Sequence, residues 1–148
     1  MPTKKFLQAY LAVGKTWIID SICCLFIILF LYASLNKLQD FQKFNIQLAK
    51  SPLLTTLSGW IAWLVPALEI LVVFLLLTKR FQLLGLYAAY FLMVLFSAYI
   101  IAILNFSKYI PCSCGGILQN MSWIEHLIFN IVFIVLAIIG VLIYPDKN

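Results

Sequence analysis

Residues 60–77 read WIAWLVPALEILVVFLLL, and this stretch decides the fold. Glu69 is its only charged residue. A run of about 18 predominantly apolar residues is long enough to cross the ~30 Å hydrocarbon core of a bilayer as an α-helix. The chain contains three more runs of this kind, so four membrane spans are predicted, over residues 17–35, 60–77, 82–104 and 124–144.

The composition of the whole chain agrees with this pattern. Of its 148 residues, 65% are hydrophobic and 10% are charged, whereas soluble domains are about 45–50% apolar. Each helix satisfies its own backbone hydrogen bonds, as the interior of a bilayer requires. We therefore predict an all-α, integral membrane four-transmembrane-helix bundle, in which residues 1–148 form a single membrane domain in contact with the lipid bilayer.

The connection between the first two spans has a helical pattern of its own. Its apolar side chains recur every three or four residues, with polar side chains on the opposite side. The apolar set is Leu38, Phe41, Phe44 and Leu48, and the polar set is Lys37, Asp40, Lys43 and Gln47. This pattern predicts an amphipathic interfacial helix that ends at Ser51 and Pro52. The helix either forms a lid over the later cysteine loop or only joins two spans.

Lysine and arginine residues are distributed unevenly between the two sides of the predicted bundle. The two termini and the second connection carry six of them, and the first and third connections carry four. The positive-inside rule then predicts cytoplasmic termini, with the first and third connections on the outer face of a bacterial inner membrane. Disulfides are permitted on that face. We attribute the net charge of +5 to contact with anionic lipid rather than nucleic acid.

The third connection contains the sequence PCSCGG, residues 111–116. A disulfide between Cys112 and Cys114 would close a small, strained ring, and strain makes a disulfide easier to reduce. Gly115 and Gly116 have no side chains that would block the sulfur of a partner. The pattern favours a redox pair, with soft-metal binding or packed thiols as the alternatives.

The last span begins with the sequence SWIE, residues 122–125, which has the form of a capping box. His126 follows in the first turn, and Asn130 lies one turn further on the same face. His126 is the only histidine in the chain. It is a candidate to stabilise a thiolate, to shuttle a proton or to bind a quinone carbonyl, or else it is a satisfied polar residue.

Glu69 is the second candidate residue for proton chemistry. A carboxyl group in the middle of a span costs at least ~2.5–3.5 kcal/mol and usually faces the interior of the bundle. Trp60, Trp63 and Pro66 precede it at steps of three, and we expect them to line an internal pocket beside it. Glu69 is then a proton relay or a ligand anchor, or alternatively a carboxyl that is hydrogen-bonded across the bundle.

The first span contains the remaining cysteines and one acidic residue. Cys23 and Cys24 are adjacent, and we interpret them as packed, inert thiols, because buried cysteines behave as small hydrophobic residues. We expect Asp20, near the inner end of this span, to be a cap or interface residue.

Three segments together suggest a family. They are YASLNKL (residues 32–38), PALE (66–69) and the cysteine loop PCSCGG. The chain resembles the MauE/DoxX group of redox-associated bacterial membrane proteins over essentially its whole length. This resemblance implies a link to methylamine utilisation, where MauE proteins are thought to assist disulfide formation in a periplasmic enzyme subunit, and a link to quinone-coupled oxidoreductases through DoxX.

The layout is also similar to that of quinone-linked thiol oxidases of the DsbB and vitamin K epoxide reductase type. Those proteins have a Cys-x-x-Cys next to a quinone, whereas this chain has Cys-x-Cys. Its outer first connection has no second cysteine pair. The difference argues against a relay of two disulfides within the chain.

These observations predict an inner-membrane thiol-disulfide oxidoreductase. Cys112 and Cys114 would exchange electrons with a periplasmic thiol protein, His126 and Glu69 would assist proton movement, and a quinone or another carrier would accept the electrons. Trp63 and Asn130 are the candidate cofactor-binding residues. The alternative is a non-catalytic accessory or assembly subunit that associates with other membrane subunits, in which the cysteines are structural or bind a soft metal.

Overall fold

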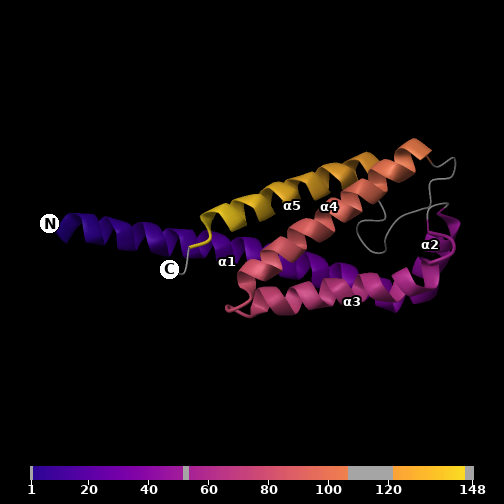
Figure 1. Ribbon diagram of the computed structural model, residues 1–148, viewed down its shortest axis with the longest axis horizontal. Helices are drawn as coiled ribbons and strands as arrows, with labels where there is room; N and C mark the ends of the chain where they lie inside the picture. The colour runs from indigo at the N-terminus through magenta and orange to yellow at the C-terminus, as the bar shows by residue number, and fades with distance from the viewer. Residues whose placement is uncertain (1, 52–53, 107–121, 146–148) are drawn as a thin grey trace.

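The computed structural model describes residues 2–51, 54–106 and 122–145, and within these ranges it contains five helices and no strand. Four of the helices are long and apolar enough to cross a membrane. The helices are α1 (Pro2–Gln39), α2 (Phe41–Lys50), α3 (Ser58–Leu77), α4 (Gln82–Phe106) and α5 (Trp123–Ile143) (Figure 1). This confirms the predicted all-α membrane fold with four spans. That one domain uses the whole chain stays a prediction.

The predicted boundaries hold for three of the four spans. Helices α3 and α5 begin and end within two residues of the predicted positions, and α4 extends two residues further. Helix α1 is much longer than predicted, with 38 residues, or about 57 Å of helix. Hydropathy detects only its apolar centre, whereas the helix itself begins at Pro2, and no further proline interrupts it. This N-terminal part extends beyond the other helices (Figure 1).

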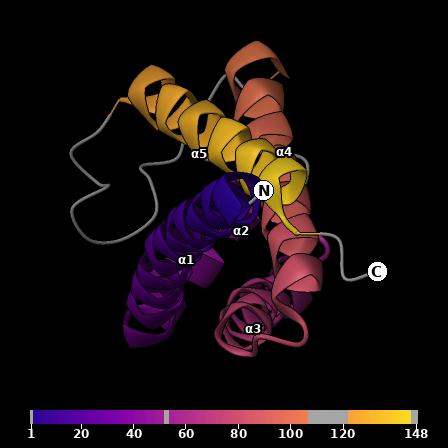
Figure 2. The ribbon, with the colours of Figure 1, turned by 90° about the vertical axis from the view of Figure 1, so that its left-hand side faces the viewer.

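The long helices pack as two antiparallel pairs. Helix α1 lies along α3, and α4 lies along α5 (Figures 1 and 2). A short turn joins α3 to α4, and the two helices diverge from that turn toward the end where α2 lies (Figure 1). At the turn they are in close contact, because a Cβ atom on Gly85 would lie 2.9 Å from Leu76 Cδ2 and 3.0 Å from Leu76 N. Glycine at this position permits the approach.

The interior between the helices is apolar. Phe26, Phe30 and Met93 are among its fully buried side chains, and the rings of Phe26 and Phe133 meet edge to face with their centroids 5.2 Å apart. Cys23 packs in this core, which agrees with the predicted role, whereas Cys24 is exposed.

Helix α2 is the predicted amphipathic helix, but it begins later than the pattern suggested. Leu48 is buried against the bundle, and the helix ends at Lys50 with Ser51 as its C-cap, close to the predicted end. Lys37 and Leu38 were assigned to it from the sequence, and both belong to α1 instead. The reason is register: Lys37 continues the buried face of α1 that includes Phe30, so its side chain points into the bundle.

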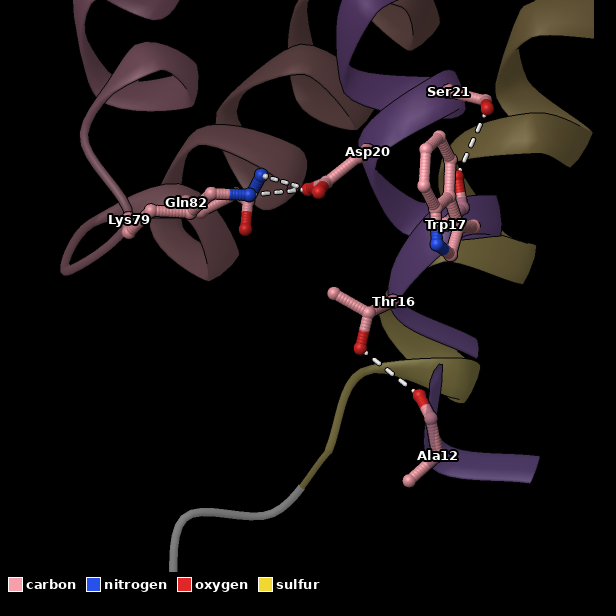
Figure 3. Close-up of polar contacts among 7 residues, drawn as sticks. All are labelled: Ala12, Thr16, Trp17, Asp20, Ser21, Lys79 and Gln82. Carbon is pink, nitrogen blue, oxygen red and sulfur yellow. Dashed lines mark hydrogen bonds and ion pairs between the residues drawn. The ribbon is translucent and has the colours of Figure 1, made fainter. Parts of the chain in front are cut away.

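At the opposite end of the bundle a polar cluster ties α1 to the turn between α3 and α4. Asp20 forms an ion pair with Lys79 and accepts a hydrogen bond of 3.3 Å from Gln82 Nε2. Figure 3 shows both partners pointing toward Asp20 from the neighbouring helix and turn. Asp20 is therefore an interface residue, one of the two roles expected of it.

Candidate functional site

A buried ion pair links the end of α1 to the middle of α3. Lys37 Nζ lies 2.5 Å from Glu69 Oε1, and the two side chains are 8% and 1% exposed. The ammonium also lies over two rings, 5.9 Å from the centroid of Phe44 in α2 and 5.6 Å from that of Phe96 in α4. Contacts at this range between a cation and an aromatic ring are attractive. Groups from three other helices, α2, α3 and α4, therefore stabilise the charge of Lys37.

A cavity of about 370 Å³ adjoins the ion pair, and all five helices contribute to its wall. This volume is within the range of ~300–1,000 Å³ that is usual for small-molecule sites. Most of the wall is apolar. The polar residues of the wall are Lys37, Glu69, Tyr99, His126 and Asn130.

Two polar atoms of the cavity wall have no hydrogen-bond partner among the described residues. They are Glu69 Oε2, an acceptor, and Asn130 Nδ2, a donor. Both residues are buried, with exposures of 0% and 3%. A buried polar group without a partner costs about 1–3 kcal/mol. The cavity therefore presents one acceptor and one donor that a ligand can satisfy.

The start of α5 places the remaining polar residues at this cavity. The predicted capping box is present: Glu125 N donates to Ser122 Oγ at 3.3 Å, and Ser122 N donates to Glu125 Oε2 at 2.7 Å. The box fixes the first turn of the helix. His126 and Asn130, one turn apart, both face the cavity as a result.

The structure thus brings Glu69, His126 and Asn130 together, but not Trp63. The Trp63 side chain is 62% exposed and does not line the cavity. Its ring packs on Phe41 of α2, with 4.6 Å between the centroids. That Trp63 binds a cofactor stays a prediction, and the exposed position of its side chain outside the cavity does not support it.

The expectation that Trp60, Trp63 and Pro66 share the side of Glu69 is wrong for the two tryptophans, since both are exposed whereas Pro66 is buried. Each residue of a helix turns by about 100°, so every step of three falls roughly 60° short of a full turn. After three such steps, Trp60 lies on the side opposite Glu69.

Cys112 and Cys114 lie outside the described residues, and their predicted redox and metal-binding roles stay predictions. Within the described ranges, no group of three or more histidine, cysteine, aspartate or glutamate side chains is placed to hold a metal ion. The segment that carries both cysteines begins after Phe106 of α4 and ends before α5. Trp123, the first residue of α5, is part of the cavity wall.

Lys37 is the functional residue that the sequence reasoning missed. The pattern places it on the polar side of the interfacial helix, although it also lies in the segment YASLNKL that carries the family resemblance. Two observations would have identified it. A carboxylate buried in a span usually needs a charged partner, and Lys37 lies seven residues after Phe30 in an unbroken helix, which puts both on one face.

Residues 15–143 match the family model of methylamine utilisation protein MauE. The matched range covers most of the chain and includes the ion pair and the polar residues of the cavity. No curated protein and no solved structure matches this chain. The MauE part of the resemblance is confirmed, and the link to DoxX stays a prediction.

Proposed function

The chain belongs to the MauE family of methylamine utilisation proteins, and from this premise we propose that it is an inner-membrane thiol-disulfide redox protein. Its four apolar helices make it a multi-pass membrane protein. The proposed redox centre is the Cys112/Cys114 pair on the periplasmic side, and the proposed partner is a periplasmic protein whose disulfides form during methylamine utilisation.

The exchange with the partner would proceed in two displacement steps. A cysteine thiolate of the partner attacks one sulfur of the Cys112–Cys114 disulfide, which forms a mixed disulfide and releases the other sulfur as a thiolate. A second partner thiolate then attacks the mixed disulfide. The partner keeps the new disulfide, and Cys112 and Cys114 are left as two thiols that hold the two electrons and two protons removed from the partner.

The observation that carries this proposal is the convergence of the five helices on a cavity with unsatisfied polar atoms. Its apolar wall suits a lipid-soluble quinone, and Asn130 Nδ2 suits one of its oxygens. A quinone bound there would supply an acceptor for two electrons and two protons. The segment with Cys112 and Cys114 joins α4 to α5, and α5 begins in the wall of the same cavity.

The residues of the chain would guide protons between the thiols and the cavity. His126 lies half-buried in the first turn of α5 and carries the imidazole group that most readily accepts and releases a proton near neutral pH. Glu69 Oε2 is a second proton acceptor. Lys37 holds the Glu69 carboxylate in place through Oε1 and so leaves Oε2 directed to other partners.

Trapping the thiols in intact cells tests the proposal. An alkylating reagent that adds mass to free thiols should show the Cys112/Cys114 pair largely oxidised at steady state and transiently reduced when unfolded, reduced partner is supplied. A Cys23→Ala, Cys24→Ser background removes the other two thiols of the chain. A pair that stays fully reduced in growing cells would contradict the redox function.

A non-catalytic accessory subunit is the second candidate. Membership of the MauE family supports a membrane accessory role. In that case loss of the chain would remove other membrane subunits from the membrane fraction, while Cys112→Ser and Cys114→Ser would leave those subunits at normal abundance.

A further inference from the structure

One side of the cavity wall is exposed on the outer surface of the bundle. Among the described wall residues, only Leu64 and Leu95 are exposed, at 54% and 47%. Leu64 lies in α3 and Leu95 in α4. These two helices diverge from their turn toward the end of the bundle where α2 lies (Figure 1). Both helices are membrane spans. The exposed side of the cavity therefore faces the bilayer rather than water.

The wall is rich in aromatic rings, with Phe30, Phe44, Phe96, Phe129 and Trp123 among its residues. Aromatic side chains pack favourably against other rings, edge to face or offset. The volume of about 370 Å³ holds a ring with a short part of a chain, so the rest of a longer chain would leave between Leu64 and Leu95.

The unsatisfied atoms specify the polar end of such a ligand. Glu69 Oε1 accepts from Lys37, and Oε2 has no donor among the described residues. A carboxylate offers acceptors only, so Oε2 is satisfied by a hydroxyl group and not by a carbonyl or an ether oxygen. Asn130 Nδ2 in turn needs an acceptor oxygen. A hydroxyl-bearing ring supplies both, whereas a ring that carries only carbonyl oxygens supplies one.

We infer that this cavity binds an aromatic amphiphile whose ring carries a hydroxyl group, the chemistry of a phenol or a hydroquinone, and that this ligand enters from the bilayer between Leu64 and Leu95. The inference deepens the proposed function, since it assigns to the same cavity a preference for the reduced form of a quinone. It also stands as a binding property that needs no electron transfer.

Two redox-inert probes test the preference for a donor. In the methyl ether of para-decylphenol a methyl group replaces the hydroxyl hydrogen and removes the donor, and neither probe exchanges electrons with thiols. Binding of each to the purified chain in bilayer discs is measured by calorimetry, with empty discs subtracted. We expect the phenol to bind about tenfold more tightly, because the ether leaves the Glu69 oxygen unsatisfied. Equal affinities, or no binding of either probe, would overturn the inference.

Variants of the wall separate the two polar contacts. Asn130→Leu keeps the size of the side chain and removes the donor, so both probes should bind more weakly while the preference for the phenol remains. Glu69→Gln should reduce the preference for the phenol. If the preference survives unchanged in Glu69→Gln, the carboxylate is not the acceptor and the assignment fails.

The route of entry is tested at the two leucines. Leu64→Trp and Leu95→Trp each place a large side chain at the proposed opening, so the association rate of the phenol should fall several-fold. Leu71→Trp is the matched control, because Leu71 lies two turns further along the same face of α3, is 52% exposed and does not line the cavity. The route would be excluded if Leu71→Trp lowered the association rate as much as the two wall variants do. It would also be excluded if Leu64→Trp and Leu95→Trp had normal thermal stability and left the association rate unchanged.

The result is separable from the redox proposal. Thiol trapping of Cys112 and Cys114 is independent of probe binding. A redox-active pair in a chain that binds both probes equally would remove only the inference, and donor-selective binding in a chain with inert cysteines would remove only the proposed function.

Discussion

Lys37 and Glu69 are 32 residues apart in the sequence, and their charged atoms meet at 2.5 Å inside the bundle. Taking two charges out of water costs several kcal/mol for each ion, and their attraction offsets that cost only while both are present. The pair therefore couples α1 to α3, because the buried charge of each residue is stabilised only by the charge of the other.

We predict that removing one member of the pair destabilises the chain and that removing both does so much less. Lys37→Met and Glu69→Leu should each lower the free energy of unfolding by about 3–5 kcal/mol, because each leaves a buried charge without its partner. The double variant should recover most of this loss. Unfolding in mixed micelles measures it, with Lys43→Met on the exposed side of α2 as the control. Additive losses in the double variant would show that the two charges are not coupled.

The close approach of α3 and α4 makes a second prediction about stability. Gly85→Ala should destabilise the chain by about 1–3 kcal/mol, since the added Cβ overlaps atoms of Leu76 and the helices must move apart. Gly59 is the matched control, because a Cβ there meets nothing within 4 Å. Thermal unfolding of both variants gives the comparison. A neutral Gly85→Ala would mean that the turn adjusts without cost.

The topology is tested by labelling. A maleimide that cannot cross the inner membrane should label Cys112 or Cys114 in intact, reduced cells and leave Cys23 and Cys24 unlabelled. Cys23 is buried in the core, and Cys24 lies within a membrane span. Labelling of Cys112 and Cys114 only after permeabilisation of the inner membrane would reverse the orientation and remove the periplasmic proposal.

The cysteine pair predicts a covalent intermediate. Cys112→Ser and Cys114→Ser should each abolish activity, and one of them should accumulate a mixed disulfide with a periplasmic protein, because the resolving thiol is missing. A non-reducing gel followed by mass spectrometry identifies the adduct. If both variants support normal growth on methylamine, catalysis by this pair is excluded.

The polar residues of the cavity predict a slower return of the pair to its oxidised form. Glu69→Gln and His126→Ala should slow reoxidation of Cys112 and Cys114 several-fold, with the rate expressed per amount of chain in the membrane, because Glu69→Gln also leaves the charge of Lys37 unpaired. Glutamine keeps an oxygen that accepts from Lys37 and loses the proton chemistry.

The matched control for this experiment is Glu125→Gln, which changes the exposed neighbour of His126 and can keep the capping box. Reoxidation at the normal rate in Glu69→Gln and His126→Ala would leave both residues as structural contacts. Loss of other subunits from the membrane would favour the accessory role.

The sequence predicted the four spans and the capping box because both depend on local patterns. Apolar length determines a span, and the spacing of Ser122 and Glu125 determines the box. The same local information placed His126 and Asn130 on one face of α5, where the structure has them.

The ion pair and the opening of the cavity were not predictable in this way. The partner of Glu69 depends on how α1 packs against α3, and the register of Lys37 depends on where α1 ends, which hydropathy does not define. The exposed wall at Leu64 and Leu95 depends on the angle between α3 and α4. No pattern within either helix encodes that angle.

Helices α3 and α4 are in close contact at Gly85 and diverge from that point, so the angle between them determines how far apart their other ends lie. Leu95 lies ten residues after Gly85 in α4, or about 15 Å along the helix, so each degree of change in the angle at the turn moves it by roughly 0.3 Å. Asp20 holds the turn through Lys79 and the start of α4 through Gln82. A change in structure at this turn would therefore alter the spacing of α3 and α4 near Leu64 and Leu95, on the opposite face of the membrane.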